Sequence, residues 1–330
     1  MSGWKKKYID AVNNTFKQKN VLVIGDLMVD EYIIGKVKRI SPEAPVPVLD
    51  FSERSLKAGG ASNVAHNIRS LGAKVSIAGI AADDQPGKWL RSHFEEIGIE
   101  SKGIVSEASR PTTLKTRYAT KGQQLLRMDN EVADDILEET QVQILNYLSA
   151  NINDYDAVVL SDYKKGVLNS KEFVRKIISI CNENKVFVSI DSKSRNIEAF
   201  ENADFVKPNN LELEEAVGVQ IRDEDSLNLA GSKYLSRSGA RALVVTRGSK
   251  GISVFEPQKS RQDFPAKDVQ VYDVCGAGDT VISTISLARI SGLSMDESVK
   301  LANLAAGVVI TKVGTVAVTS EELIGSINAE

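Results

Sequence analysis

An α/β fold with a doubly wound, mostly parallel sheet and a small β-sheet lid is predicted for this chain of 330 residues. Short apolar runs rich in β-branched residues alternate with segments of helical period, which is the rhythm of βαβ units. Two stretches, at about 31–53 and 112–129, interrupt this rhythm with alternating side chains. No low-complexity linker or internal repeat divides the chain, so we expect residues 1–330 to form a single domain.

The predicted core strands are short and do not alternate in polarity, as expected for parallel strands covered on both faces. They are 21–25, 75–80, 157–161, 186–190 and 242–246. Amphipathic helices are predicted between them, near 61–71, 86–97, 134–150, 170–184 and 226–238. Ligands of such sheets bind at the carboxyl ends of the strands. Four residues close or follow these strands and are expected at that edge: Asp26, Asp162, Asp191 and Thr246.

The two interrupting stretches have the pattern of hairpins. In the first, residues 32–40 and 46–51 are separated by a turn at 41–45, and the second turns at Lys121-Gly122. We expect both hairpins to form a lid over the ligand-binding edge. A small sheet exposes an apolar face unless it meets a partner, so a homodimer through the lid is predicted.

Composition excludes several classes of function. Hydrophobic residues make up 42% and charged residues 26% of the chain, and the formal net charge is -3. There is no basic excess, so neither nucleic acid nor membrane is expected as a partner. No apolar run could span a bilayer, and residues 1–19 lack the apolar core of a signal peptide. With only Cys181 and Cys275, a disulfide framework is not expected, and we predict a cytoplasmic enzyme.

The segment 273–280 carries the strongest chemical signal. Gly276 and Gly278 flank Ala277 just before a helix-periodic apolar stretch, where the first amides of the helix favour a phosphate. Asp279 lies in the first turn, a place that suits a base taking a proton from an alcohol that attacks a phosphoryl group. The alternative is an ordinary helix start with an acidic residue. No G-x-x-x-x-G-K-[ST] loop occurs, which disfavours a P-loop NTPase.

Six motifs in order resemble those of the ribokinase-like (PfkB) sugar kinases, over about residues 20 to 318. They are Gly25-Asp26 with Asp30, Gly59–Ala65, Lys207–Glu212, Thr246–Gly251, Gly276–Thr280 and Ala302–Gly307. The motifs at 39–48, 110–117, 126–129 and 161–166 more closely resemble bacterial D-glycero-D-manno-heptose-7-phosphate kinases. In many relatives this module is fused to a C-terminal adenylyltransferase domain, so the chain is either a stand-alone kinase or an excised domain.

The resemblance implies that Asp279 is the catalytic base and that the amides of Gly276, Ala277 and Gly278 stabilise the transferred group. Residues expected to hold the sugar are Asp26, Asp30, Gly60, Asn63 and Asp162. Lys115 and Arg117 are two apart on a predicted strand and therefore share a face. Cations expected to bind a substrate phosphate are Lys115, Arg117, Arg127 and Lys165. An ordinary exposed charged strand is the alternative.

On the nucleotide side, the residues implied by the resemblance are Lys193, Asn209, Thr246, Gly248, Gly251 and Asn303. Asn209 and Glu212 are three apart at a helix start, and their oxygen atoms suit Mg²⁺, partly through water. A helix cap is the alternative for this pair. The family also suggests a monovalent cation such as K⁺, or a structural role, at Asp273.

The resemblance predicts ATP-dependent phosphorylation of the anomeric hydroxyl of D-glycero-D-manno-heptose 7-phosphate. The product would be heptose 1,7-bisphosphate, on the route to ADP-heptose and lipopolysaccharide core. One alternative is another ribokinase-like kinase, for fructose 1-phosphate or 2-keto-3-deoxygluconate, with a different lid. Another is a non-catalytic sugar- or nucleotide-sensing module, which would have no need of Asp279.

Overall fold

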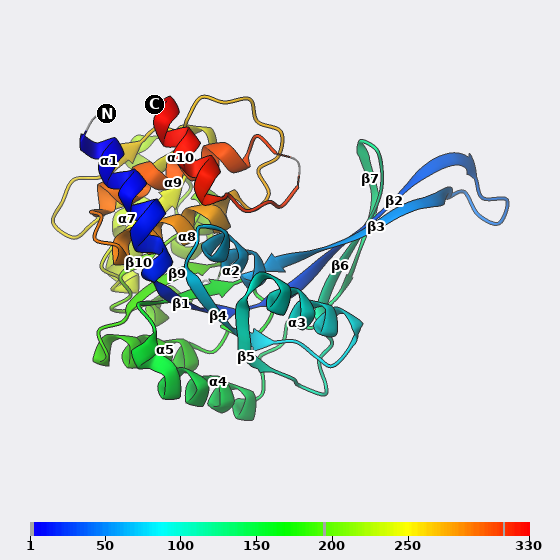
Figure 1. The fold of residues 1–330 in the computed structure, drawn as a ribbon, viewed down its shortest axis with the longest axis horizontal. Coiled ribbons are helices and arrows are strands. Elements are labelled where there is room, and N and C mark those ends of the chain that lie inside the picture. The colour runs from blue at the N-terminus through cyan, green and yellow to red at the C-terminus, as the bar shows by residue number, and fades with distance from the viewer. Residues whose placement is uncertain (1–2, 194–195, 313) are drawn as a thin grey trace.

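The structure is a computed structural model that describes residues 3–193, 196–312 and 314–330. In these residues a large sheet with helices on both faces carries a small projecting sheet (Figure 1). Among the described residues, the strands of the large sheet follow the order β13-β12-β11-β10-β9-β8-β1-β4-β5. Its strands are β1 (Asn20–Gly25), β4 (Lys74–Ile80), β5 (Ile99–Val105), β8 (Ala157–Asp162), β9 (Phe187–Ser192), β10 (Phe205–Val206), β11 (Leu243–Thr246), β12 (Ile252–Phe255) and β13 (Gln262–Phe264). Pairing is parallel except at β11–β12 and β12–β13, which confirms the predicted fold class.

Two hydrophobic clusters fix the helices to the sheet. Along β1, Val21 and Val23 face one cluster and Leu22 and Ile24 face the other, because successive side chains point to opposite faces. The first cluster contains α1 (Gly3–Asp10), α2 (Ala61–Ser70), α3 (Gln85–Ile97), α8 (Ala277–Ile290), α9 (Met295–Val309) and α10 (Ser320–Ala329). The second contains α4 (Glu138–Asn151), α5 (Lys171–Glu183), α6 (Asn210–Val217) and α7 (Glu224–Ser238). Single-turn helices lie at Ala11–Thr15, Phe16–Gln18, Ile152–Asp154, Ile197–Ala199 and Gly248–Lys250.

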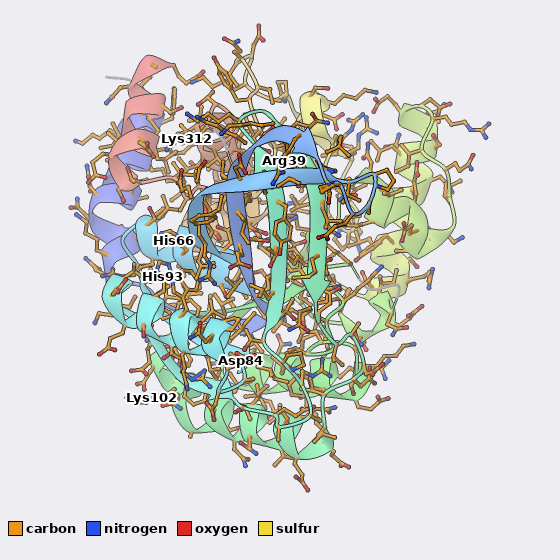
Figure 2. All side chains as sticks on the ribbon, turned by 90° about the vertical axis from the view of Figure 1, so that its right-hand side faces the viewer. Arg39, His66, Asp84, His93, Lys102 and Lys312 are labelled. Carbon is orange, nitrogen blue, oxygen red and sulfur yellow. The ribbon has the colours of Figure 1, made fainter. Side chains whose placement is uncertain are left out.

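The small sheet is the predicted lid. It consists of β2 (Leu27–Ile40), β3 (Pro47–Gly60), β6 (Thr113–Thr120) and β7 (Gln123–Asn130), in the order β3-β2-β6-β7. The long β2–β3 hairpin projects from the body, and Arg39 marks it in the view toward the lid (Figures 1 and 2). The first hairpin is longer than the predicted 31–53, because the buried residues Leu27, Met28 and Val29 already pair with the end of β3.

All five predicted core strands and all five predicted helices are present, with ends displaced by a few residues. Elements that the sequence interpretation did not include are α1, β5, β10, β12, β13 and α10. β5 begins at Ile99 and continues with the polar residues Glu100, Ser101 and Lys102, so its apolar signal is weak. Among the described residues, no helix has the length and apolar character needed to cross a membrane.

Candidate active site

The carboxyl ends of β1, β8 and β9 meet at one edge, as predicted, because these strands are adjacent and parallel. Asp26 follows β1 and accepts hydrogen bonds from the amides of Tyr163, Lys165 and Val167, at 2.7, 3.0 and 3.1 Å. Burial and the neighbouring Asp162 raise the pKa of Asp26 to about 6. These contacts shape the loop that follows β8, so the Asp26 carboxylate organises that loop.

Asp162 closes β8 and is also engaged within the protein. Its carboxylate accepts hydrogen bonds from the Lys164 amide at 2.7 Å and from the Ser192 hydroxyl at 2.6 Å. Only 2% of Asp162 is exposed. Sugar contacts by Asp26 and Asp162 therefore remain predictions, and the geometry gives both residues a role in building the edge.

Asp279 lies in the first turn of α8 and is 5% exposed. Its two carboxylate oxygens are held by the Tyr163 hydroxyl and by the Asn63 amide, each at 2.6 Å. Burial and repulsion from Asp191 raise the pKa of Asp279 to about 6, although both hydrogen bonds oppose the shift. The group is therefore ionised at neutral pH and still basic enough to accept a proton from an alcohol.

The start of α8 has the turn that the glycines predicted. Gly276 precedes the helix with φ of 79°, a left-handed conformation that favours glycine. The Ala277 amide already donates to the Val274 carbonyl at 3.3 Å, so its predicted place in the phosphate cradle is weakened. The amides of Gly278 and Asp279 belong to the first helical turn, where an amide has no acceptor within the helix.

Lys207 supplies a positive charge at this helix start that the sequence interpretation missed. Its ammonium group pairs with Asp191 at 3.0 Å and is 4% exposed. A Cβ atom placed on Gly278 would lie 3.3 Å from that ammonium group, so Lys207 lies directly against the first turn of α8. Burial alone would lower the pKa of Lys207, but Asp191 and Glu212 raise it. Its position at the head of the Lys207–Glu212 motif was the available signal.

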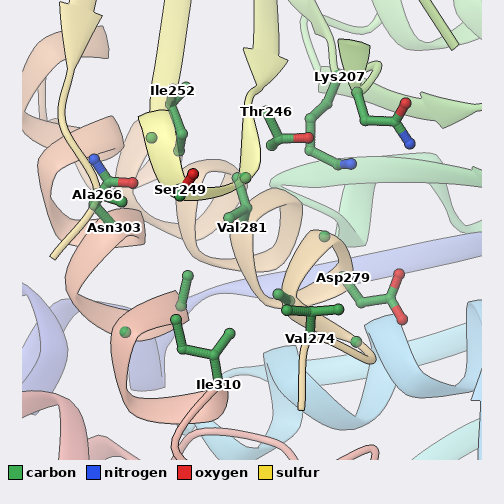
Figure 3. Close-up of a pocket in the computed structure, with 18 of the residues that line it drawn as sticks. Lys207, Thr246, Ser249, Ile252, Ala266, Val274, Asp279, Val281, Asn303 and Ile310 are labelled. Carbon is green, nitrogen blue, oxygen red and sulfur yellow. The ribbon is translucent and has the colours of Figure 1, made fainter. Parts of the chain in front are cut away.

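A cavity of about 910 Å³ opens beside Asp279 and is lined by all six residues predicted for the nucleotide side. Figure 3 shows Lys207 and Asp279 toward one side of it, and Ala266 and Asn303 toward the other. The Asn303 amide donates to the carbonyls of Phe264 and Pro265, both at 3.2 Å, so it also positions the cavity wall. The six residues are Lys193, Asn209, Thr246, Gly248, Gly251 and Asn303.

Asn209 and Glu212 form the capping box that was the alternative to a metal site. The Asn209 side chain accepts from the Glu212 amide at 2.9 Å, and the Glu212 carboxylate accepts from the Asn209 amide at 2.8 Å. Both residues also line the cavity, and burial and Asp191 raise the pKa of Glu212. A cation held with phosphates would relieve that repulsion, so the residues fit a divalent metal. In the described parts of the chain, no three His, Cys, Asp or Glu side chains form a metal cluster by themselves.

The predicted cationic surface of the lid is balanced by acidic residues. Lys115 pairs with Asp129 at 3.0 Å and with Glu131 at 2.7 Å, and Lys165 pairs with the other Glu131 oxygen at 2.6 Å. Arg127, with a side chain 51% exposed, pairs with Asp129 at 2.9 Å. Glu131 thus joins a lid lysine to a core lysine. It lies two residues after the 126–129 motif and was not singled out from the sequence.

Asp30 lies within β2, whereas the sequence interpretation placed it before the first lid strand. Its carboxylate pairs with Arg117 at 2.6 Å. A Cβ atom on Gly59 would lie 2.4 Å from an Asp30 oxygen, and one on Gly60, where φ is 58°, would lie 2.5 Å from the Asp26 carbonyl. The two glycines therefore let β3 pass close to both aspartates. Asn63, two residues into α2, reaches Asp279 and positions it.

Known proteins resemble this chain in sequence. The profile of the pfkB family carbohydrate kinases matches residues 18–322. The protein named "Bifunctional protein HldE" of Geobacter sulfurreducens is 39% identical over 308 residues, which is 93% of this chain and 63% of that protein. The protein of the same name from Geobacter metallireducens is 38% identical over 98% of this chain and 66% of its own length. The chain thus spans slightly less than two thirds of these relatives.

Solved structures share the fold at low sequence identity. A ribokinase of Arabidopsis thaliana, complexed with ribose and ATP, has a TM-score of 0.74 and 17% identity, with 94% of this chain and 98% of that chain covered. Phosphofructokinase-2 of Escherichia coli, in complex with potassium, has a TM-score of 0.76 and 19% identity over the same shares. The ribokinase-like fold predicted from the motifs is confirmed.

Proposed function

The chain belongs to the pfkB family of carbohydrate kinases, and we propose that it phosphorylates the anomeric hydroxyl of D-glycero-D-manno-heptose 7-phosphate with ATP. The observation that carries the proposal is the buried Asp279 carboxylate at the start of α8, beside Lys207 and a cavity of about 910 Å³. The heptose substrate is supported by the curated relatives and by the motifs of the lid. The product is heptose 1,7-bisphosphate, which enters ADP-heptose and lipopolysaccharide core synthesis.

In this mechanism Asp279 orients the attacking hydroxyl and accepts its proton as the new bond to the γ-phosphorus forms, while the bond from that phosphorus to the bridging oxygen breaks and ADP leaves. Negative charge on the transferred group is stabilised by the first amides of α8 and by Lys207. Because these donors are fixed before the reaction, they require little rearrangement in the transition state. Asn209 and Glu212 are the residues that would hold Mg²⁺, which supplies charge neutralisation on the phosphates of ATP. A monovalent cation near Asp273 remains a prediction.

The substrate phosphate is proposed to bind at the lid-to-core cluster formed by Lys115, Lys165 and Arg117. Their side chains are 13%, 19% and 21% exposed, so a bound phosphate would be partly shielded from water. Binding requires the two lysines to exchange Glu131 for phosphate oxygens. A dianionic phosphate offers more acceptor atoms than a single carboxylate, which favours that exchange.

A homodimer through the lid is proposed from the apolar side chains that the lid exposes. Phe51 is 67% exposed, Ile40 61% and Leu126 60%, and all three lie on lid strands. Burial of these side chains against a second copy would remove the exposed apolar surface from water. We propose residues 1–330 as one kinase domain that works in the cytoplasm, where ATP is supplied.

A coupled ADP-release assay with ATP and Mg²⁺ tests the function. Separate reactions contain heptose 7-phosphate, fructose 1-phosphate, fructose 6-phosphate, ribose and 2-keto-3-deoxygluconate. Turnover confined to the heptose phosphate is the expected result. Turnover on another sugar would retain the kinase chemistry and overturn the heptose assignment. Bound ATP with no turnover on any sugar would favour the sensing module.

A further inference from the structure

Tyr163 belongs to the 161–166 motif. Neither the activity of the family nor the sequence interpretation assigns a role to this residue. It follows β8, and its backbone amide is one of the three that donate to Asp26. Since the Asp26 carboxylate is 1% exposed, this attachment fixes the start of the loop firmly to the core. The Tyr163 side chain lines the cavity beside Asp279 from this fixed start.

The Tyr163 hydroxyl donates to Oδ1 of Asp279 at 2.6 Å, while Asn63 donates to Oδ2 at 2.6 Å. Two donors from two different elements thus hold the carboxylate, one from the loop after β8 and one from α2. A hydrogen bond of this length to an ionised oxygen is strong and directional. It leaves the remaining lone pairs of Asp279 for the hydroxyl of the sugar.

One face of the Tyr163 ring carries a cation. The Lys193 ammonium group lies 3.6 Å from the ring centroid, in the same cavity wall as Asp191 and Asn209. A cation over the ring withdraws electron density from the phenol and makes its O–H group a stronger donor. Phosphates in the cavity would attract Lys193 away from the ring. The charged groups that face Asp279 or the ring are Asp191, Lys193, Lys207 and Glu212.

The geometry points to Tyr163 as the positioning residue of the catalytic base. The strength with which its hydroxyl donates depends on Lys193, and the position of Lys193 depends on whether the nucleotide site is occupied. When phosphates draw Lys193 from the ring, the Tyr163–Asp279 hydrogen bond weakens and Asp279 becomes a better proton acceptor. Nucleotide binding thereby activates the base. This inference rests on the proposed role of Asp279, and it adds to that role the control of its basicity.

The test compares the pH dependence of kcat/KM for the wild-type enzyme and the Tyr163→Phe variant, with whichever sugar the wild type phosphorylates. Phenylalanine keeps the ring under Lys193 and the hydrogen bond that the backbone amide donates to Asp26, and it removes only the hydroxyl. Loss of a donor to the ionised base moves the acidic limb of the profile to higher pH. The kcat value is expected to fall about tenfold, the size of one hydrogen bond to a charged group, because complete removal of the donor costs the orientation of the carboxylate, which a weakened hydrogen bond retains. Titration of the substrate phosphate is common to both enzymes and cancels in the comparison.

Tyr147→Phe is the matched control, since it removes a hydroxyl that bonds to Tyr155 at 3.2 Å and to Ser76, and Tyr147 is not among the residues that line the cleft. It should leave the profile unchanged. Replacement of Tyr163 by 3-fluorotyrosine makes the phenol a stronger donor and should move the acidic limb to lower pH, with the packing retained. Opposite displacements by the two substitutions would support the inference.

An acidic limb that stays in place in both Tyr163 substitutions would overturn the inference, whatever happens to kcat. The Asp279→Asn variant, measured in parallel, separates this failure from failure of the proposed function. If Asp279→Asn is inactive and the Tyr163 substitutions leave the profile unchanged, the function stands and the positioning role is wrong. If Asp279→Asn retains wild-type turnover, the proposed base itself is wrong.

Discussion

Replacing the proposed base by asparagine should stabilise the protein while it removes activity. Asp279 is 5% exposed, and its pKa is raised from 3.8 to about 6. A difference of about two pKa units corresponds to about 3 kcal/mol. The free energy of unfolding is lower by this amount at pH 7.5, because the folded protein must keep this buried group ionised. Asparagine has nearly the same shape and no charge. The Asp279→Asn variant should therefore unfold with a free energy up to about 3 kcal/mol higher at pH 7.5.

The sign of the pH dependence provides a control within the same experiment. Between pH 3.8 and about 6 the folded protein holds a proton on Asp279 that the unfolded chain has released. The stability of the wild type therefore falls as pH rises through this window, whereas the variant lacks this contribution. At pH 4.5 most of the difference between the two proteins should have disappeared.

Urea unfolding followed by circular dichroism at pH 7.5 and 4.5 measures both quantities, and the ADP-release assay measures turnover. We expect kcat to fall by about a hundredfold or more, as for the loss of a general base. A variant that is less stable than the wild type at pH 7.5 would refute the argument. So would a stability difference that is the same at both pH values.

Four further predictions concern the substrate, the metal and the dimer. Lys115→Met and Lys165→Met should each raise KM for the sugar phosphate about tenfold in steady-state assays, with little effect on an unphosphorylated analogue. Glu131→Gln should lower that KM, because it removes the carboxylate that both lysines share, and an unchanged or higher KM would contradict the exchange. Glu212→Gln should raise the Mg²⁺ concentration for half-maximal rate and leave thermal stability nearly unchanged, since glutamine also completes a capping box. Phe51→Glu should give monomers in sedimentation velocity, while persistent dimers would place the interface elsewhere.

The fold could be predicted because its signals are local. β1 and β8 are continuous apolar runs, and the helices between core strands have a clear helical period. The lid was found for the same reason, but its start at Leu27 was not. The residues 27–29 are apolar and buried, so sequence alone could not distinguish strand from core loop there. β10 has only two residues, which are too few to show a period. It pairs with β9 and β11, which are separate segments of the chain.

The candidate site could be predicted where a residue type and a turn coincide, as at Gly276 and Asp279. Contacts between distant segments were not accessible, because they depend on how the strand ends come together. Tyr163 and Asn63 reach the same carboxylate from positions 116 and 216 residues away from Asp279 in the chain. The charge balance of the lid was missed for a related reason, since Glu131 meets Lys165 only after the lid folds over the core.

The most direct test of the central claim is ³¹P NMR of the reaction of the wild-type enzyme with ATP, Mg²⁺ and heptose 7-phosphate. The account predicts that the original sugar phosphate signal is retained and that, beside the signals of ADP, one new sugar phosphate signal appears, coupled to the anomeric proton. The γ-phosphate signal of ATP should decrease in step. A new signal coupled to any other proton of the sugar, or consumption of ATP without a phosphorylated sugar, would contradict the account.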